Sequence, residues 1–222
     1  MTPRVKICCI TSVAEAELAI RAGASALGLV SAMPSGPGVL EEEAIRTIAA
    51  RIPPGVTSVL LTSKRSAGEI VGQQRRCRVG AIQLCDRLEL DGHRHLRQAL
   101  PGVALIQVVH VEGPDAVEEA RLVAAEVDAL LLDSGRPGLP VRELGGTGRT
   151  HDWALSRAIV ESVPVPVFLA GGLDPENVGE AVRRVSPYGL DVCSGLRGPE
   201  GLDPRRLGAF MARVGDRSLE RA

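Results

Sequence analysis

The sequence predicts an α/β fold, a single (β/α)8 TIM barrel in which eight parallel strands alternate with helices. Short apolar runs alternate with amphipathic stretches along the chain, and eight such units follow one another without a long gap. A repeated strand–helix–strand unit requires a parallel sheet, and eight parallel strands close most readily into a barrel. The length of 222 residues fits one such domain, with an open doubly wound sheet as the alternative.

The eight apolar runs are the expected strands. They cover residues 5–8, 26–30, 58–61, 81–84, 104–109, 129–132, 165–169 and 190–193. Capping chemistry marks helix starts between them: Ser12 with Glu15 and Ser66 with Glu69 have capping-box spacing, and Asp174-Pro175 and Asp203-Pro204 pair a cap with a proline. The residues after about 214 are expected to form a polar tail.

Composition narrows the class of ligand. The formal net charge is −1, from 26 basic and 27 acidic side chains, so no long-range field would gather a nucleic acid or an anionic membrane. Only four aromatic residues are present, which disfavours base stacking and large stacked cofactors. No apolar run approaches the roughly 20 residues of a membrane span, and no signal-peptide pattern opens the chain. We expect a cytoplasmic protein with a small polar or phosphorylated ligand.

The cysteines are predicted to be free thiols. Their number is odd and their spacing matches no disulfide framework: Cys8, Cys9, Cys77, Cys85 and Cys193. A disulfide between the adjacent Cys8 and Cys9 would be strained. No Cys-x2-Cys or His-x3-His pair accompanies them, so neither a metal site nor a metal cofactor is expected.

Two residues at predicted strand ends carry acid–base chemistry. Cys8 closes the first run and Asp133 follows the sixth, and in barrels of this type the active site forms where strands end. A thiol and a carboxyl at one mouth could serve as general base and general acid. Taken singly, Cys8 could be a small core residue and Asp133 a loop cap. Their shared position favours a catalytic pair.

Three glycine-rich segments follow the late strands. They are Gly145-Gly146-Thr147-Gly148, Gly171-Gly172-Leu173 and Ser194-Gly195. Glycine lets backbone N–H groups approach an anion closely, and the loops after the seventh and eighth strands are the usual phosphate site of such barrels. One such segment alone could be ordinary turn chemistry. Three together predict that a substrate phosphate binds here.

Several motifs occur in the order found in one enzyme family. They are Lys6-Ile7-Cys8, Leu131-Leu132-Asp133, Gly145-Gly146-Thr147-Gly148-Arg149-Thr150 with Asp152-Trp153, and Leu169-Ala170-Gly171-Gly172-Leu173 with Pro175-Glu176-Asn177-Val178. From about residue 4 to residue 214, the chain resembles phosphoribosylanthranilate isomerase. The resemblance implies a (β/α)8 barrel of tryptophan biosynthesis that performs an Amadori rearrangement without metal or organic cofactor.

The resemblance also implies a role for each matching residue. Asp133 would protonate the furanose ring oxygen and open the sugar to a Schiff base, and Cys8 as thiolate would then remove the C2 proton. The phosphate cradle would consist of Gly146, Gly171, Gly172, Ser194 and Gly195. The expected partner is a small phosphorylated sugar-amine, and the chain is expected to be a monomer or homodimer.

The departures from the family pattern lie at the end of the site that would hold the aromatic amine. Cys9 replaces a glycine, residues 35–37 read Ser-Gly-Pro instead of Ser-Pro-Arg, and Cys85 replaces a histidine. The arginine expected to bind the anthranilate carboxylate is therefore missing. Arg197, just past the eighth strand, is the nearest replacement, and Arg136 is the second, because a guanidinium is a planar bidentate donor.

Three alternatives remain open at this point. The chain could isomerise a different phosphoribosyl amine, or it could be a non-catalytic phosphometabolite-binding barrel. The related isomerase of histidine biosynthesis has an aspartate at the first-strand position, so Cys8 argues against it, as does the lack of two matching halves.

Overall fold

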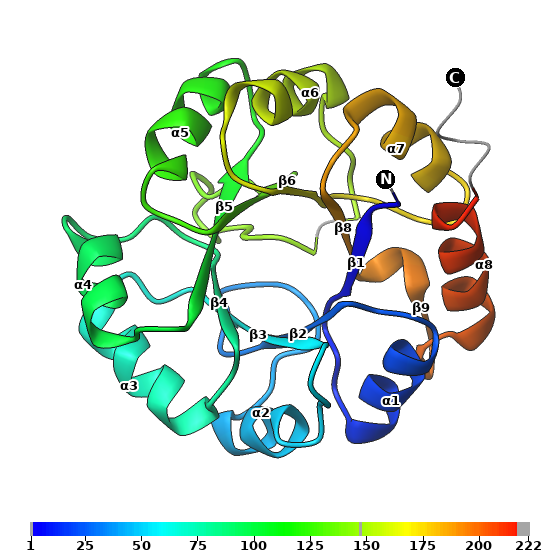
Figure 1. Ribbon diagram of the computed structural model, residues 1–222, viewed down its shortest axis with the longest axis horizontal. Helices are drawn as coiled ribbons and strands as arrows, with labels where there is room; N and C mark the ends of the chain where they lie inside the picture. Colours follow the sequence, from blue (N-terminus) through cyan, green and yellow to red (C-terminus); the bar gives the residue numbers. More distant parts are fainter. Residues whose placement is uncertain (1, 147, 217–222) are drawn as a thin grey trace.

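The expected strands form a closed parallel barrel, in the order β1 to β8, which excludes the open doubly wound sheet (Figure 1). The computed structural model describes residues 2–146 and 148–216. The barrel strands are β1 (Arg4–Ile7), β2 (Ala26–Val30), β3 (Thr57–Thr62), β4 (Ala81–Leu84), β5 (Ala104–His110), β6 (Ala129–Asp133), β7 (Val167–Leu169) and β8 (Gly189–Val192). A short antiparallel pair, β9 (Arg197–Gly198) and β10 (Gly201–Leu202), follows β8.

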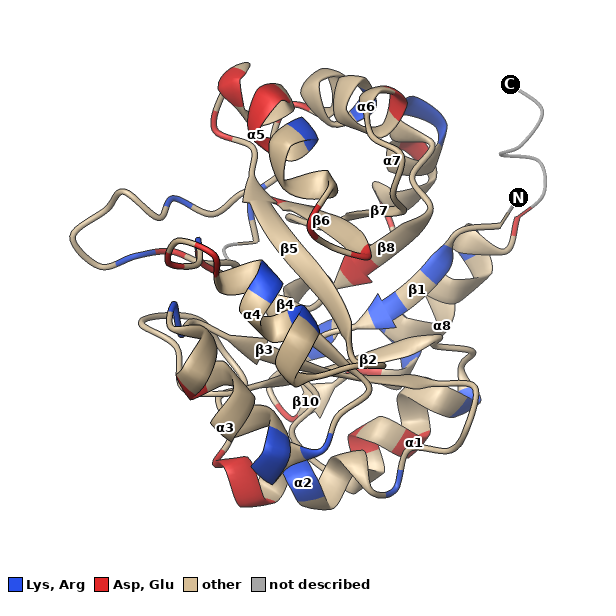
Figure 2. Cartoon of the chain, turned by 60° about the vertical axis from the view of Figure 1, so that its left-hand side comes forward, with Lys and Arg blue, Asp and Glu red and all other residues tan. Residues whose placement is uncertain are grey.

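Helices surround the barrel as an outer ring (Figure 1). They are α1 (Val13–Arg21), α2 (Glu42–Ala49), α3 (Ala67–Cys77), α4 (Gly92–Ala99), α5 (Asp115–Ala124), α6 (Trp153–Ser162), α7 (Val178–Val185) and α8 (Pro204–Val214), with a 3₁₀ turn η1 (Ser194–Leu196) after β8. Figure 2 shows the charged residues mainly on these helices and on the loops, with blue on β1 and red near β8 as exceptions. Each helix therefore buries its apolar stripe against the sheet and exposes its polar face.

Two helix starts agree with the prediction from capping chemistry. Ser12 accepts a hydrogen bond from the Glu15 N–H at 3.1 Å and caps α1. Asp203 accepts from the N–H groups of Arg205 and Arg206 at 2.8 and 3.1 Å, and Pro204 occupies the first turn of α8. These bonds satisfy backbone donors that a helix leaves unpaired at its first turn.

The other two predicted starts need correction. Ser66 does precede α3, but within the described residues its side chain makes no capping bond, and Glu69 pairs with Lys64 at 3.1 Å. Asp174 does not begin a helix: its carboxylate accepts from Glu176 and Asn177 N–H at 2.9 and 2.8 Å and closes a turn, so that α7 begins only at Val178.

Strand limits shift slightly from the prediction. Cys8 and Cys193 lie one residue beyond β1 and β8, and β7 begins at Val167, after Val165-Pro166. Proline has no N–H to donate to a ladder, which is consistent with β7 starting after it. Residues 217–222 of the expected polar tail, and Thr147 of the glycine-rich segment, lie outside the described residues.

Both faces of the sheet are buried, which explains the nearly continuous apolar runs. In β3, Leu60 packs outward into the core shared with the helices, whereas Val59 and Leu61 pack inside the barrel. In β6, Leu131 likewise points inward. No helix in the described part of the chain has the length and apolar character of a membrane span.

A buried ion pair joins the first and last strands. Lys6 and Asp191 are register partners of β1 and β8, and the Lys6 Nζ lies 2.8 Å from the Asp191 Oδ1. Lys6 is 1% exposed and Asp191 7% exposed. A charge so deeply buried needs its partner, because an isolated ion in the interior is very costly. The pair therefore lies across the seam that closes the barrel.

We expect Lys6→Met to lower the free energy of unfolding by about 3–5 kcal/mol, since it leaves Asp191 charged, buried and unpaired. The double variant Lys6→Met/Asp191→Leu should regain much of this loss. Denaturant unfolding measures both variants. Arg157→Met is the control, because the ion pair of Arg157 with Glu161 is exposed and its loss should change the free energy of unfolding by about 1 kcal/mol or less. A single variant as stable as the unmodified chain would contradict the role of the ion pair.

Candidate active site

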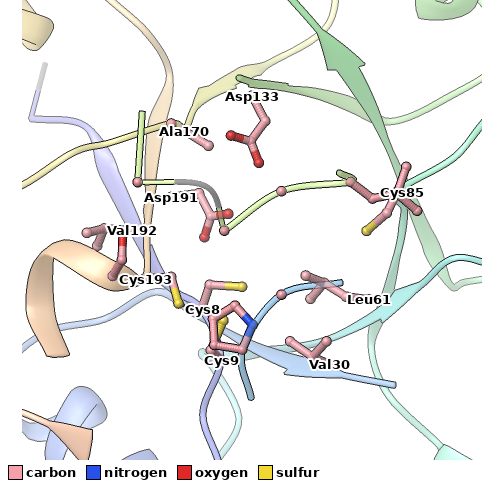
Figure 3. A pocket seen from close by; sticks show the side chains of 18 of the residues that line it. Cys8, Cys9, Val30, Leu61, Cys85, Asp133, Ala170, Asp191, Val192 and Cys193 are labelled. Atoms are coloured by element: carbon pink, nitrogen blue, oxygen red, sulfur yellow. Dashed lines mark hydrogen bonds between the residues drawn. The ribbon is translucent and has the colours of Figure 1, made fainter. Parts of the chain in front are cut away.

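A pocket lies at the mouth of the barrel where the carboxyl ends of the strands meet the following loops (Figure 3). Most of the site residues predicted from the sequence line it: Cys8, Asp133, Gly146, Gly171, Gly172 and Ser194. Gly195, Arg197 and Arg136 are not among the lining residues. The strand ends thus bring the thiol, the carboxyl and most of the glycine cradle to one cavity.

Cys8 is held by the end of the first strand. Its N–H donates to the Val192 carbonyl at 2.9 Å, so its backbone continues the β1–β8 ladder. On the neighbouring strand, a Cβ at Gly28 would lie 2.9 Å from the Cys8 Sγ. Only glycine at position 28 leaves room for the sulfur, which turns into the pocket (Figure 3).

Asp133 ends β6 and presents its carboxyl to the same pocket (Figure 3). The residue is 8% exposed, and burial raises the pKa of its carboxyl to about 6, although a hydrogen bond from the Ser134 N–H at 2.7 Å acts in the opposite direction. A Cβ at Gly145 would lie 2.7 Å from the Asp133 Oδ2, so the sixth loop passes very close to this oxygen. The raised pKa keeps a proton on the carboxyl to higher pH than usual.

The Lys6–Asp191 pair adds a fixed charge next to the thiol. Burial acts to lower the pKa of Lys6, but the charge of Asp191, with a smaller contribution from Cys8, outweighs it and raises the pKa. Lys6 is therefore an ammonium close enough to Cys8 to interact with it.

The glycine segments adopt backbone conformations that other residues rarely adopt. Gly171 and Gly172 have φ of +82° and +61°, and a Cβ at Gly172 would lie 2.7 Å from the carbonyl carbon of Arg149. A Cβ at Gly195 would lie 2.0 Å from the Leu173 carbonyl oxygen. Gly195 therefore lets the loops after β7 and β8 pack together, although it does not line the pocket itself.

The other side of the pocket is apolar. It is formed by side chains from the ends of β2 and β3 and from the loops after β2 and β6: Val30, Met33, Leu61 and Leu144. The Ser35 hydroxyl donates to the Arg142 carbonyl at 2.8 Å and joins the loops after β2 and β6. Such a wall can hold a flat, apolar ring against the acid–base pair.

The structure does not bring the two candidate arginines to the pocket. Arg197 donates to both carboxylate oxygens of Glu15, at 3.0 and 3.1 Å, and contacts the Cys9 carbonyl. Burial acts to raise the pKa of Glu15, but hydrogen bonds, first that from Arg197, outweigh it and hold the pKa at about 2. Arg136 is exposed and pairs through its backbone with Glu143. Arg197 supports the loop after β1, and we assign neither arginine to the aglycone.

Sequence reasoning assigned no role to four residues near the site. Asp191 and Cys193 line the pocket, as does Cys9, whereas Lys6 lies buried next to them. The signal for Lys6 and Asp191 was available, because a charged residue inside an apolar strand requires a partner. No comparable signal was available for Cys9 and Cys193, since their contact depends on two loops 184 residues apart.

Comparisons with known proteins identify the family and agree with the barrel fold. Residues 5–204 match the family model of N-(5'-phosphoribosyl)anthranilate (PRA) isomerase. An N-(5'-phosphoribosyl)anthranilate isomerase of Methanocella arvoryzae is 38% identical over 204 residues, 92% of this chain and 93% of that protein. A crystal structure of phosphoribosyl anthranilate isomerase from Thermus thermophilus has a TM-score of 0.80 and 30% identity, and covers 95% of this chain and 98% of its own.

A further crystal structure includes a bound ligand. It is a phosphoribosyl anthranilate isomerase in complex with reduced 1-(o-carboxyphenylamino)-1-deoxyribulose 5-phosphate, with a TM-score of 0.79 and 27% identity, covering 96% of this chain and 98% of that one. The bound molecule carries a sugar phosphate and a carboxyphenyl group.

We expect inorganic phosphate or sulfate to bind between the loops at Gly171-Gly172 and Ser194-Gly195, because backbone N–H groups there can approach an anion. Gly172→Ala should weaken this binding, since alanine is strained at that φ and its Cβ would meet Arg149. Gly208→Ala is the control, because a Cβ there meets open space. Anion-soaked crystals and titration calorimetry measure the effect. An anion at the opposite mouth of the barrel, with these loops empty, would contradict the assignment.

Proposed function

The chain belongs to the phosphoribosylanthranilate isomerase family, and we propose that it performs the family's rearrangement with Cys8 as general base and Asp133 as general acid. It is an intramolecular isomerase of tryptophan biosynthesis, which converts N-(5'-phosphoribosyl)anthranilate to the corresponding 1-deoxyribulose 5-phosphate ketose. The observation that supports the residue roles best is that a buried thiol and a carboxyl with a raised pKa line the same pocket. We propose that the chain works in the cytoplasm, as expected from its sequence.

Asp133 serves as the general acid in the first step. A pKa of about 6 leaves a fraction of its carboxyl protonated near neutral pH, where an ordinary aspartate is almost fully ionised. The protonated carboxyl donates to the furanose ring oxygen, the C1–O bond breaks, and the anilino nitrogen forms a Schiff base with C1. A general acid works best when its pKa lies near the working pH, and burial supplies that shift here.

Cys8 serves as the general base in the second step. The iminium formed by ring opening acidifies the C2–H bond, and the thiolate of Cys8 removes this proton to give an enolamine that tautomerises to the aminoketose. The ammonium of Lys6 lies close enough to Cys8 to interact with it. The carboxylate of Asp191 fixes Lys6 in place at 2.8 Å.

Substrate binding is divided between two sides of the pocket. The glycine loops around Gly171-Gly172 and Ser194 hold the phosphate, and the apolar wall with Val30, Leu61 and Leu144 holds the aromatic ring. Phosphate and ring together position C1 and C2 between Asp133 and Cys8, and such positioning contributes a large share of catalysis.

We expect Cys8→Ser and Asp133→Asn each to lower kcat by on the order of 10²-fold or more, the usual effect of losing a positioned base or acid. Turnover of phosphoribosylanthranilate, followed by fluorescence, measures both variants. Cys77→Ser is the matched control, because this cysteine lies in α3, away from the pocket.

Full activity in either active-site variant would refute the assigned roles. Turnover of another phosphoribosyl amine, without turnover of the anthranilate compound, would instead assign the chain to a different substrate of the same reaction class.

A further inference from the structure

Two cysteines meet at the edge of the active-site pocket. The Sγ atoms of Cys9 and Cys193 are 2.6 Å apart, and Figure 3 shows both residues beside Cys8. This distance is shorter than the about 3.5–4.0 Å at which unbonded heavy atoms pack, and only about 0.5 Å longer than a disulfide bond. Very little movement separates this thiol pair from a covalent link between the loops after β1 and β8.

The backbone around Cys9 is shaped to place this side chain. Cys9 has a φ of +59°, which is uncommon for a residue other than glycine and is associated with functional sites. A Cβ at Gly38 would lie 2.7 Å from the Cys9 Cβ, so glycine at position 38 makes room for Cys9. The loop after β2 therefore leaves space for the Cys9 side chain, although a residue other than glycine is disfavoured at the backbone conformation of Cys9.

The thiols differ in their reactivity. A hydrogen bond with Cys9 lowers the pKa of Cys193, and the positive charge of Arg197 adds to this effect. Burial raises the pKa of Cys85, and raises that of Cys77 to about 11. Since the thiolate is the attacking species, Cys193, which is also only partly buried, should react before these two.

We propose that Cys9 and Cys193 form a site of reversible oxidation, an intramolecular disulfide made by exchange with a low-molecular-weight disulfide. The Cys193 thiolate attacks one sulfur of that disulfide, forms a mixed disulfide and releases one thiolate, which takes up a proton. Cys9 then loses its proton to solvent and attacks the Cys193 Sγ, which expels the second thiolate. Two protein thiols are oxidised and one disulfide is reduced to two thiols.

The link also affects Cys8, a consequence that rests on the proposed function. Cys9 and Cys193 line the pocket beside Cys8 and Ser194. A disulfide between them draws together the loops after β1 and β8, which carry Cys8 and the phosphate-binding Ser194. We expect the oxidised enzyme to turn over about three- to tenfold more slowly, because a displacement of a fraction of an ångström is enough to slow a reaction that depends on positioning.

The experiment uses the full chain, reduced, desalted and incubated in mixtures of oxidised and reduced glutathione. After acid quenching and alkylation, the intact mass should show that two of the five cysteines have become inaccessible. Fragmentation of the unreduced peptides should identify the link, and dithiothreitol should restore both thiols and turnover.

Variants separate the possible links. Cys9→Ser and Cys193→Ser should lose the disulfide, Cys77→Ser should form it as the unmodified chain does, and Cys8→Ser should also form it. A link that contains Cys8, a mixed glutathione disulfide that does not close, or five thiols still open to alkylation would overturn the proposal.

Turnover is measured separately from the intact mass of the alkylated protein. An oxidised protein that turns over as fast as the reduced protein would also overturn the proposal, because the disulfide would then have no influence on the active site. If the reduced protein does not convert phosphoribosylanthranilate, the proposed function is wrong. The mass measurement alone then decides whether the disulfide site exists.

Discussion

The ion pair between Lys6 and Asp191 is the interaction on which the rest of the structure depends. It joins the first strand to the last at 2.8 Å, inside a barrel whose other interior side chains are mainly apolar. Neither charge could be buried alone at acceptable cost. The next residues along β1 and β8 lead directly to Cys8, Cys9, Cys193 and the phosphate loop. The same pair that completes the sheet therefore also fixes the orientation and charge of the catalytic pocket.

Two carboxyl groups in this pocket have different environments and, in our proposal, different roles. Asp191 is bonded to an ammonium, whereas Asp133 makes no ion pair within the described residues. Burial raises the pKa of Asp133 to about 6, although the Ser134 hydrogen bond and the charges of His110 and Lys6 act in the opposite direction, and this shift suits Asp133 to donate a proton. Lys6 pairs with Asp191 next to Cys8, while Asp133 lies across the cavity (Figure 3).

The sequence predicted the barrel and the acid–base pair because both follow from periodicity. Parallel strands all end at one mouth, so finding the strand ends to within a residue or two was enough to place Cys8 and Asp133 together. The direction of a side chain in a loop does not follow from periodicity. Arg197 turns to Glu15, 182 residues away, and no local pattern records that partner. Asp174-Pro175 has the composition of a helix start, but its carboxylate closes a turn instead.

The most direct test of the proposed chemistry is the titration of Asp133 itself. With aspartate labelled at the carboxyl carbon, the difference between the NMR spectra of the unmodified chain and Asp133→Asn isolates this group. Because its pKa is raised in the folded protein, the protonated form should persist as pH increases and disappear through a midpoint of about 6. A midpoint near the ordinary aspartate value of about 4 would contradict the role of Asp133 as a buried general acid.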